Sequence, residues 1–166
     1  MNPSSSPISA VVALASGLLL LHRIRDGRRE VFLVHPGGPF WRNKDQGAWS
    51  IPKGEFDRGE EALDAAKREY REETGFEPPA GPYVPLGAIT QPSGKIVEAW
   101  SVPGECDPAQ VRSNTVLLEW PPHSGRKRDF PEVDRAAWFD LPEARRRILR
   151  GQREFLTALE RALDGS

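Results

Sequence analysis

The sequence predicts an α/β fold in which strands and helices follow one another along a single chain. Two apolar runs, residues 11–23 and 30–35, lie on either side of an Asp-Gly turn and indicate a buried β-hairpin. Residues 63–73 contain no Gly or Pro and are rich in good helix formers, so they predict a helix. Apolar residues at helical spacing return in residues 141–162, where Gly151 is expected to divide the segment into two helices.

Further strands are expected elsewhere in the chain, together with a loop over residues 121–131. The strand candidates are residues 49–53, 82–91, 95–102, 113–120 and 134–139. Neither an internal repeat nor a long linker is visible. We therefore expect a flexible tail over residues 1–7 and a single domain over residues 8–166.

Length and composition indicate a soluble globular protein. The chain has 166 residues, of which 38% are hydrophobic and 28% charged, and this is enough for one core. The formal net charge of −1 argues against a general nucleic-acid coat protein and against a polybasic membrane binder. We expect no membrane association and no stable nucleic-acid complex.

Three features favour a cytoplasmic location. Cys106 is the only cysteine, so no intrachain disulfide can form, which fits a reducing compartment. Residues 8–21 are apolar, but 14 residues are too few to span a bilayer. Residues 1–7 carry no Lys or Arg, whereas a signal peptide would place positive charge before its apolar run.

The 63–73 helix has predictable ends. Asp57 followed by Glu60 has the spacing of a capping box, so the helix is expected to begin near there. Gly75 is a suitable residue for the position just after the helix, and two prolines follow at 78 and 79 and prevent its continuation.

Three carboxylates share one side of this helix. At about 100° per residue, Glu69, Glu72 and Glu73 fall together beside an apolar stripe. Like charges at this spacing each cost roughly 0.2–0.5 kcal/mol, so the cluster favours a compensating positive charge. Oxygen ligands suit Mg²⁺, which also shares substrate phosphates. Periodicity alone leaves open the alternative of a solvated acidic face without a ligand.

The spacing across residues 54–76 resembles the Nudix box. Gly54 is followed after five residues by Glu60, and after seven more by residues 68–76, Arg-Glu-Tyr-Arg-Glu-Glu-Thr-Gly-Phe. Every fixed position of the motif is filled, and Tyr70 stands where the family usually carries an aliphatic residue. The resemblance implies the Nudix fold, an α/β/α sandwich with a mixed β-sheet between helices.

The resemblance also implies a reaction, the hydrolysis of a nucleoside diphosphate linked to another group with Mg²⁺ or Mn²⁺ as cofactor. Glu72 and Glu73 match the principal metal ligands of the family, and Glu69 matches a third acid that binds metal or orients water. The backbone carbonyl of Lys53 matches a frequent further ligand. The residues that match positions shaping the loop and helix are Gly54, Glu60, Arg68 and Gly75.

The general base is less determined, because relatives often carry it outside the box. Glu132 precedes the 134–139 strand at roughly the place where relatives have that acid. Glu98 and Asp134 are further candidates, and Glu69 or Glu73 could serve instead. An ordinary surface carboxylate is the alternative for each residue outside the box.

A nucleotide-type small molecule is the expected partner. Aromatic rings stack on a base for roughly 1–3 kcal/mol, and Phe40, Trp41, Trp100 and Trp120 are candidates if they are not core residues. Arginines can grip additional phosphates by charge-assisted hydrogen bonds unless their loop is simply solvated. The residues assigned to the substrate site are Trp41, Glu98, Trp100, Arg126 and Arg128. His35 is expected to stabilise the following turn rather than to bind phosphate.

Several alternatives stay open at this point. A catalytically silent module that senses a nucleotide or binds a partner is the second candidate function, although such proteins usually lack one of the box carboxylates. Nucleoside triphosphates and dinucleoside polyphosphates are both candidate substrates. Many relatives are dimers, so a homodimer is an open expectation.

Overall fold

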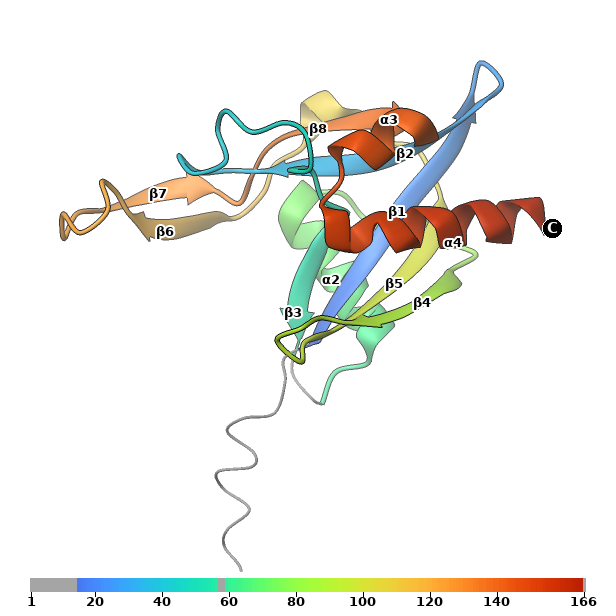
Figure 1. The fold of residues 1–166 in the computed structure, drawn as a ribbon, viewed down its shortest axis with the longest axis horizontal. Coiled ribbons are helices and arrows are strands. Elements are labelled where there is room, and N and C mark those ends of the chain that lie inside the picture. The colour runs from blue at the N-terminus through green and yellow to red at the C-terminus, as the bar shows by residue number, and fades with distance from the viewer. Residues whose placement is uncertain (1–14, 57–58, 166) are drawn as a thin grey trace, which may run out of the picture.

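A six-stranded mixed sheet lies at the centre of the molecule (Figure 1). The computed structural model describes residues 15–56 and 59–165. The strands of this sheet are β1 (Ala15–Arg25), β2 (Arg28–Pro36), β3 (Lys53–Phe56), β4 (Val84–Thr90), β5 (Ile96–Pro103) and β8 (Val133–Asp140). Their order is β4-β5-β1-β2-β8, and β3 pairs with β1. The β1–β5 pair is parallel and the other pairs are antiparallel.

Helices cover both faces of the sheet. The helix α2 (Ala62–Thr74) packs on one face, and α3 (Leu141–Arg147) and α4 (Arg153–Asp164) pack on the other (Figure 1). The structure also contains two short 3₁₀ turns, η1 (Pro108–Gln110) and η2 (Arg150–Gln152). The structure therefore confirms the predicted α/β class and the mixed sheet between helices.

The apolar run of β1 supplies both cores. Leu18 and Leu20 point to the α3 and α4 side, Leu19 and Leu21 point to α2, and all four are fully buried. Successive side chains of a strand face opposite ways, so a continuous apolar run suits a strand covered on both sides. Each fully buried leucine contributes roughly 1.5–3 kcal/mol.

One predicted strand is placed wrongly. Residues 49–53 were expected to pair, but Trp49 and Ser50 make only isolated bridges, and the strand begins at Lys53. Pro52 has no amide hydrogen to donate to a neighbouring strand, which explains why pairing starts after it. β3 then runs antiparallel to β1, with Gly54 opposite Gly17.

A separate hairpin corrects the expected loop over residues 121–131. The strands β6 (Thr115–Glu119) and β7 (Lys127–Pro131) form a two-stranded sheet that extends away from the central sheet (Figure 1). β7 begins with Lys127 and Arg128, which the sequence pattern does not distinguish from a solvated loop. Pairing with the apolar β6 makes this segment a strand.

The helices end close to the predicted places. α2 begins at Ala62 with Glu61 at the N-cap and no side-chain capping bond; Asp57 lies outside the described residues. Gly75 ends it with φ of 81°, and its amide donates to the carbonyl of Arg71. The expected tail over residues 1–7, and the first residues of the run 11–23, also lie outside the described residues. None of the helices described is both long and apolar enough to cross a membrane.

Candidate active site

Two glycines allow α2 to approach the sheet closely. A Cβ at Gly54 would lie 1.9 Å from Cδ of Glu69, and one at Gly17 would lie 2.8 Å from the carbonyl oxygen of Ala62. Gly54 and Gly17 are paired between β3 and β1, so together they form the surface on which α2 packs. The glycine that opens the motif therefore leaves room for the carboxylate of Glu69.

Arg68 holds three acids at once. Its guanidinium donates to both oxygens of Glu60 at 2.9 Å, to Oε1 of Glu69 at 2.8 Å and to Oε2 of Glu72 at 3.1 Å. These contacts lower the pKa of the Glu60 carboxyl and, with Glu60 contributing most, raise the pKa of Arg68. Arg68 thus neutralises much of the acidic side of α2 and joins it to the segment that precedes the helix.

Glu73 is the buried acid of the site. Its side chain is almost covered, and Oε1 accepts a hydrogen bond of 3.0 Å from the backbone amide of Lys53. Burial raises the pKa of Glu73 to about 7, and the charges of Glu132 and Glu69 add to this effect. The amide of Lys53 opposes the shift by stabilising the ionised form.

The other acids lie within electrostatic reach of one another. Desolvation raises the pKa of Glu69. The negative charges of Glu72 and Glu132 nearby raise it further. Desolvation also raises the pKa of Glu132, again with a contribution from Glu72. Carboxylates that perturb one another's pKa in this way are typical of functional sites.

A small pocket brings four of the predicted residues together. It has a volume of about 130 Å³, and Trp41, Lys53, Glu73 and Glu132 are in its wall. Sequence reasoning missed the rest of the lining, because these residues come from distant segments with no motif of their own. They are Val34, Pro36, Ser50, Val133 and Leu149.

The carboxylates fit a hard divalent cation by chemistry. Glu69, Glu72 and Glu73 offer only oxygen, which Mg²⁺ and Mn²⁺ prefer. The raised pKa values of Glu69 and Glu73 indicate that added positive charge would be favourable there. In the ranges 15–56 and 59–165, however, no three acidic, histidine or cysteine side chains are gathered closely enough to hold a metal ion. Arg68 is bonded to two of the acids, so binding a cation would require those side chains to turn.

Several candidate residues lie away from this pocket. Glu98 and Trp100 are on β5, which is separated from β3 by β1, and Trp100 packs against the core under α2. Asp134 faces the buried His35, whose Nδ1 lies 2.9 Å from Oδ1 of Asp134. Arg126 and Arg128 lie in the β6–β7 hairpin. None of these side chains lines the pocket around Glu73.

His35 connects the neighbouring loop to the sheet. Its Nε2 donates to the carbonyl oxygen of Lys44 at 2.6 Å, and its ring meets the edge of Trp49 at 5.1 Å between centroids. Asp45 in the same loop accepts from Nε1 of Trp49 at 2.8 Å. These contacts hold the segment that carries Trp41 against β2.

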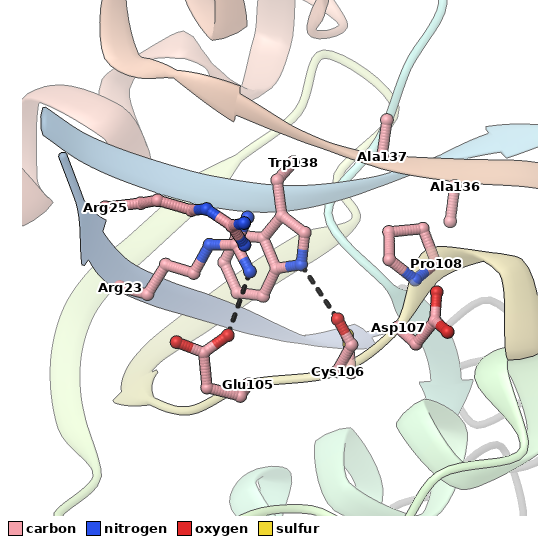
Figure 2. A pocket seen from close by; sticks show the side chains of 9 residues that line it. All are labelled: Arg23, Arg25, Glu105, Cys106, Asp107, Pro108, Ala136, Ala137 and Trp138. Atoms are coloured by element: carbon pink, nitrogen blue, oxygen red, sulfur yellow. Dashed lines mark hydrogen bonds and ion pairs between the residues drawn. The ribbon is translucent and has the colours of Figure 1, made fainter.

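A larger cavity, of about 700 Å³, lies elsewhere, between β1, β8 and the segment before η1 (Figure 2). Figure 2 shows the guanidinium of Arg23 beside the ring of Trp138, 4.0 Å from its centroid, and bonded to Glu105. Nε1 of Trp138 donates to the carbonyl of Cys106, and burial raises the pKa of the Cys106 thiol to about 11. These groups are satisfied by one another, and none of the box acids lines the cavity.

Known structures share the fold. A C. elegans Ap4A hydrolase in a binary complex matches with a TM-score of 0.62 and 20% identity, covering 93% of this chain and 100% of that one. A mutT/nudix family protein from Listeria innocua has a TM-score of 0.60 and 18% identity, over 92% and 94% of the two chains. The NUDIX domain of Shewanella oneidensis NrtR, complexed with ADP ribose, has a TM-score of 0.60 and 16% identity, over 91% and 88%.

Sequence comparison gives the family directly. No curated protein matches the chain. The family model described as the NUDIX domain matches residues 18–159, which include most of the sheet, α2 and the acids of the pocket. The chain therefore belongs to the NUDIX family.

Proposed function

We propose that the protein hydrolyses a pyrophosphate bond in a nucleoside diphosphate-linked substrate, with Mg²⁺ or Mn²⁺ as cofactor. The substrate belongs to the nucleoside triphosphate or dinucleoside polyphosphate class. The observation that carries the proposal is the meeting of Glu73 and Glu132 in one pocket with Trp41 and Lys53. Acids whose ionised forms are disfavoured by burial need a cation there, and an aromatic wall suits a nucleobase.

The acids of α2 would hold the cofactor. When bound, a divalent cation neutralises charge on the diphosphate and lowers the pKa of its water. Glu69, Glu72 and Glu73 would be its ligands, together with the carbonyl of Lys53. The amide of Lys53 fixes Oε1 of Glu73, so the second oxygen of that carboxylate is the one left for other contacts.

Glu132 is the proposed general base. It lies in the wall of the same pocket as Glu73, and desolvation brings its pKa closer to neutrality than that of a free carboxyl. A base of that kind accepts a proton from water more effectively at neutral pH. Glu132 would take the proton of the attacking water, and Trp41 would position the nucleoside.

The test is a turnover assay with a panel of nucleotides and separate additions of Mg²⁺ and Mn²⁺. Products are resolved by mass spectrometry in ¹⁸O-labelled water, which shows the phosphorus that is attacked. We expect Glu73→Gln to lower kcat by orders of magnitude while circular dichroism stays unchanged. Glu77→Gln is the matched control, because Glu77 is an exposed acid that pairs with Arg71.

The silent-module alternative makes the opposite prediction. A sensing module would bind a nucleotide without releasing product at any metal concentration. Near-normal turnover in Glu73→Gln would remove the assigned role of that residue, and absence of turnover in the unmodified protein across the panel would favour the sensing module.

A further inference from the structure

The β6–β7 hairpin presents two different faces. Partners across an antiparallel pair share a face, and successive residues alternate between faces. Leu118 is opposite Arg128, and the amide of Trp120 donates to the carbonyl of Arg126. One face, which we name the arm face, therefore carries Val116, Leu118, Trp120, Arg126, Arg128 and Phe130. The opposite face carries Leu117, Glu119, Lys127 and Asp129.

The arm face is turned toward the loop that carries Trp41. A Cβ at Gly38 would lie 3.3 Å from Cδ1 of Leu118, so the two segments touch. A Cβ at Gly37 would lie 1.9 Å from the carbonyl oxygen of Pro131, so the loop can cross the end of the hairpin only with glycine there. The loop and the arm face are therefore adjoining surfaces beside the pocket.

The base of the hairpin is bonded directly to the acidic site. The amide of Asn114 donates to the carbonyl of Glu72 at 3.0 Å, and the amide of Glu132 donates to the carbonyl of Asn114 at 2.9 Å. The carbonyl of Glu132 in turn accepts from the amide of Gly37 at 2.9 Å. The hairpin consequently starts between the end of α2 and the proposed general base.

The arm face combines positive charge with exposed apolar groups. Among the residues that the structure describes, neither Arg126 nor Arg128 pairs with a carboxylate, and the guanidinium of Arg128 lies 5.7 Å from the ring centroid of Phe130. Leu118 is 37% exposed and Val116 is 36% exposed. Arginines beside apolar and aromatic groups suit an anionic chain that ends in a nucleoside.

Distance along the strand limits which part of a substrate can reach these arginines. An extended strand advances about 3.3 Å per residue, so Arg128 lies roughly 13 Å and Arg126 roughly 20 Å from Glu132. The pyrophosphate under attack at Glu73 and Glu132 is much shorter than this. The arginines are placed for groups beyond the bond that is cleaved.

We propose that the arm face binds the distal phosphates and second nucleoside of a dinucleoside polyphosphate, and so selects long substrates. The inference rests on the proposed function, because the acidic site must hold the cleaved pyrophosphate while the arm holds the remainder. Loss of the arm contacts should weaken binding of long substrates and leave short ones almost unaffected. The hairpin would then determine KM rather than the rate of the chemical step.

Equilibrium binding to the Glu73→Gln variant tests the role of the arm face without turnover of the ligand. Calorimetry compares a dinucleoside tetraphosphate with the corresponding nucleoside diphosphate in the presence of Mg²⁺. We expect Arg126→Ala with Arg128→Ala to weaken the tetraphosphate about tenfold for each arginine and the diphosphate less than about twofold. Lys127→Ala is the matched control, since this substitution also removes one positive charge but does so on the opposite face of the hairpin.

The outcomes separate the arm from the proposed function. Equal weakening of the binding of both ligands would overturn the proposed role of the arm face. An effect of Lys127→Ala equal to that of the arginine substitutions would overturn it too. A change from dimer to monomer in sedimentation with unchanged nucleotide binding would overturn it as well, and would make the face a contact between copies. If the unmodified protein hydrolysed no nucleotide of the panel, the proposed function would fail, while the binding comparison would still decide whether the arm face binds long nucleotides.

Discussion

The backbone amide of Lys53 donates a 3.0 Å hydrogen bond to Oε1 of Glu73, and it thereby joins the start of β3 to the last turn of α2. The contact holds an almost fully buried carboxylate at the end of a pocket. One hydrogen bond from a neutral amide does not offset the loss of water around the ionised group, and the pKa of Glu73 is raised to about 7. This acid should therefore make the stability of the metal-free protein depend on pH.

The first prediction concerns that dependence. An unfolded Glu has a pKa of 4.5, so between pH 4.5 and about 7 the folded protein binds more protons than the unfolded chain. The contribution of Glu73 is fully present below pH 4.5 and is lost as the pH rises through about 7. The loss amounts to about 3 kcal/mol by the rule that one pKa unit is about 1.4 kcal/mol.

The variant Glu73→Gln isolates the contribution of this carboxyl group to the pH dependence of stability. The variant cannot ionise, so the difference in free energy of unfolding between it and the unmodified protein should grow in favour of the variant from pH 5 to pH 8. Urea denaturation without divalent ions measures the difference at each pH. A difference that stayed flat over this range would show that Glu73 titrates normally, and added Mg²⁺ should reduce the slope if Glu73 is a ligand.

The second prediction concerns Gly54→Ala. The new Cβ would lie 1.9 Å from Cδ of Glu69, and this atom belongs to a flexible side chain. The carboxylate should move away with little loss of stability, and turnover should fall about as far as in Glu69→Ala. Gly59→Ala is the control, since among the described residues beyond its chain neighbours a Cβ at Gly59 would meet no atom within 4 Å.

A double-mutant cycle makes this prediction sharper. If Gly54→Ala acts through Glu69, combining it with Glu69→Ala should reduce kcat no further than Glu69→Ala alone. Additive losses in the double variant would mean that the glycine matters for another reason, such as the conformation of β3. Thermal unfolding of each variant shows whether the fold is kept.

The sequence was sufficient for the elements whose signals are local. The run of helix formers and Gly75 located α2 to within a residue at its end, since both act through their own backbone. The acids of α2 fall on one side because helical periodicity requires it. Glu132 could be placed near the site only because a family pattern suggested it, and the structure puts it in the wall of the pocket.

Other features depend on contacts between distant segments, which the sequence does not display. Strand order places β5 on the far side of β1 from β3, so Glu98 and Trp100 lie away from the pocket although their strand was identified. β7 exists because its residues pair with β6, and its basic start gave no strand signal. Arg68 could be assigned to the motif, but its bonds to three separate acids appear only in the fold.

The last prediction concerns His35 and the loop that carries Trp41. His35→Phe keeps a ring beside Trp49 but removes the hydrogen bonds to the Lys44 carbonyl and the Asp134 carboxylate. Each lost hydrogen bond costs about 0.5–1.5 kcal/mol, so the loop should detach more often and proteolysis after Lys44 should accelerate. KM should rise severalfold because Trp41 is no longer held in the pocket wall, while kcat changes less. Asp134→Asn is the conservative control, since an amide can still bond Nδ1 of His35, and a KM equal to that of the unmodified protein in His35→Phe would contradict the positioning role.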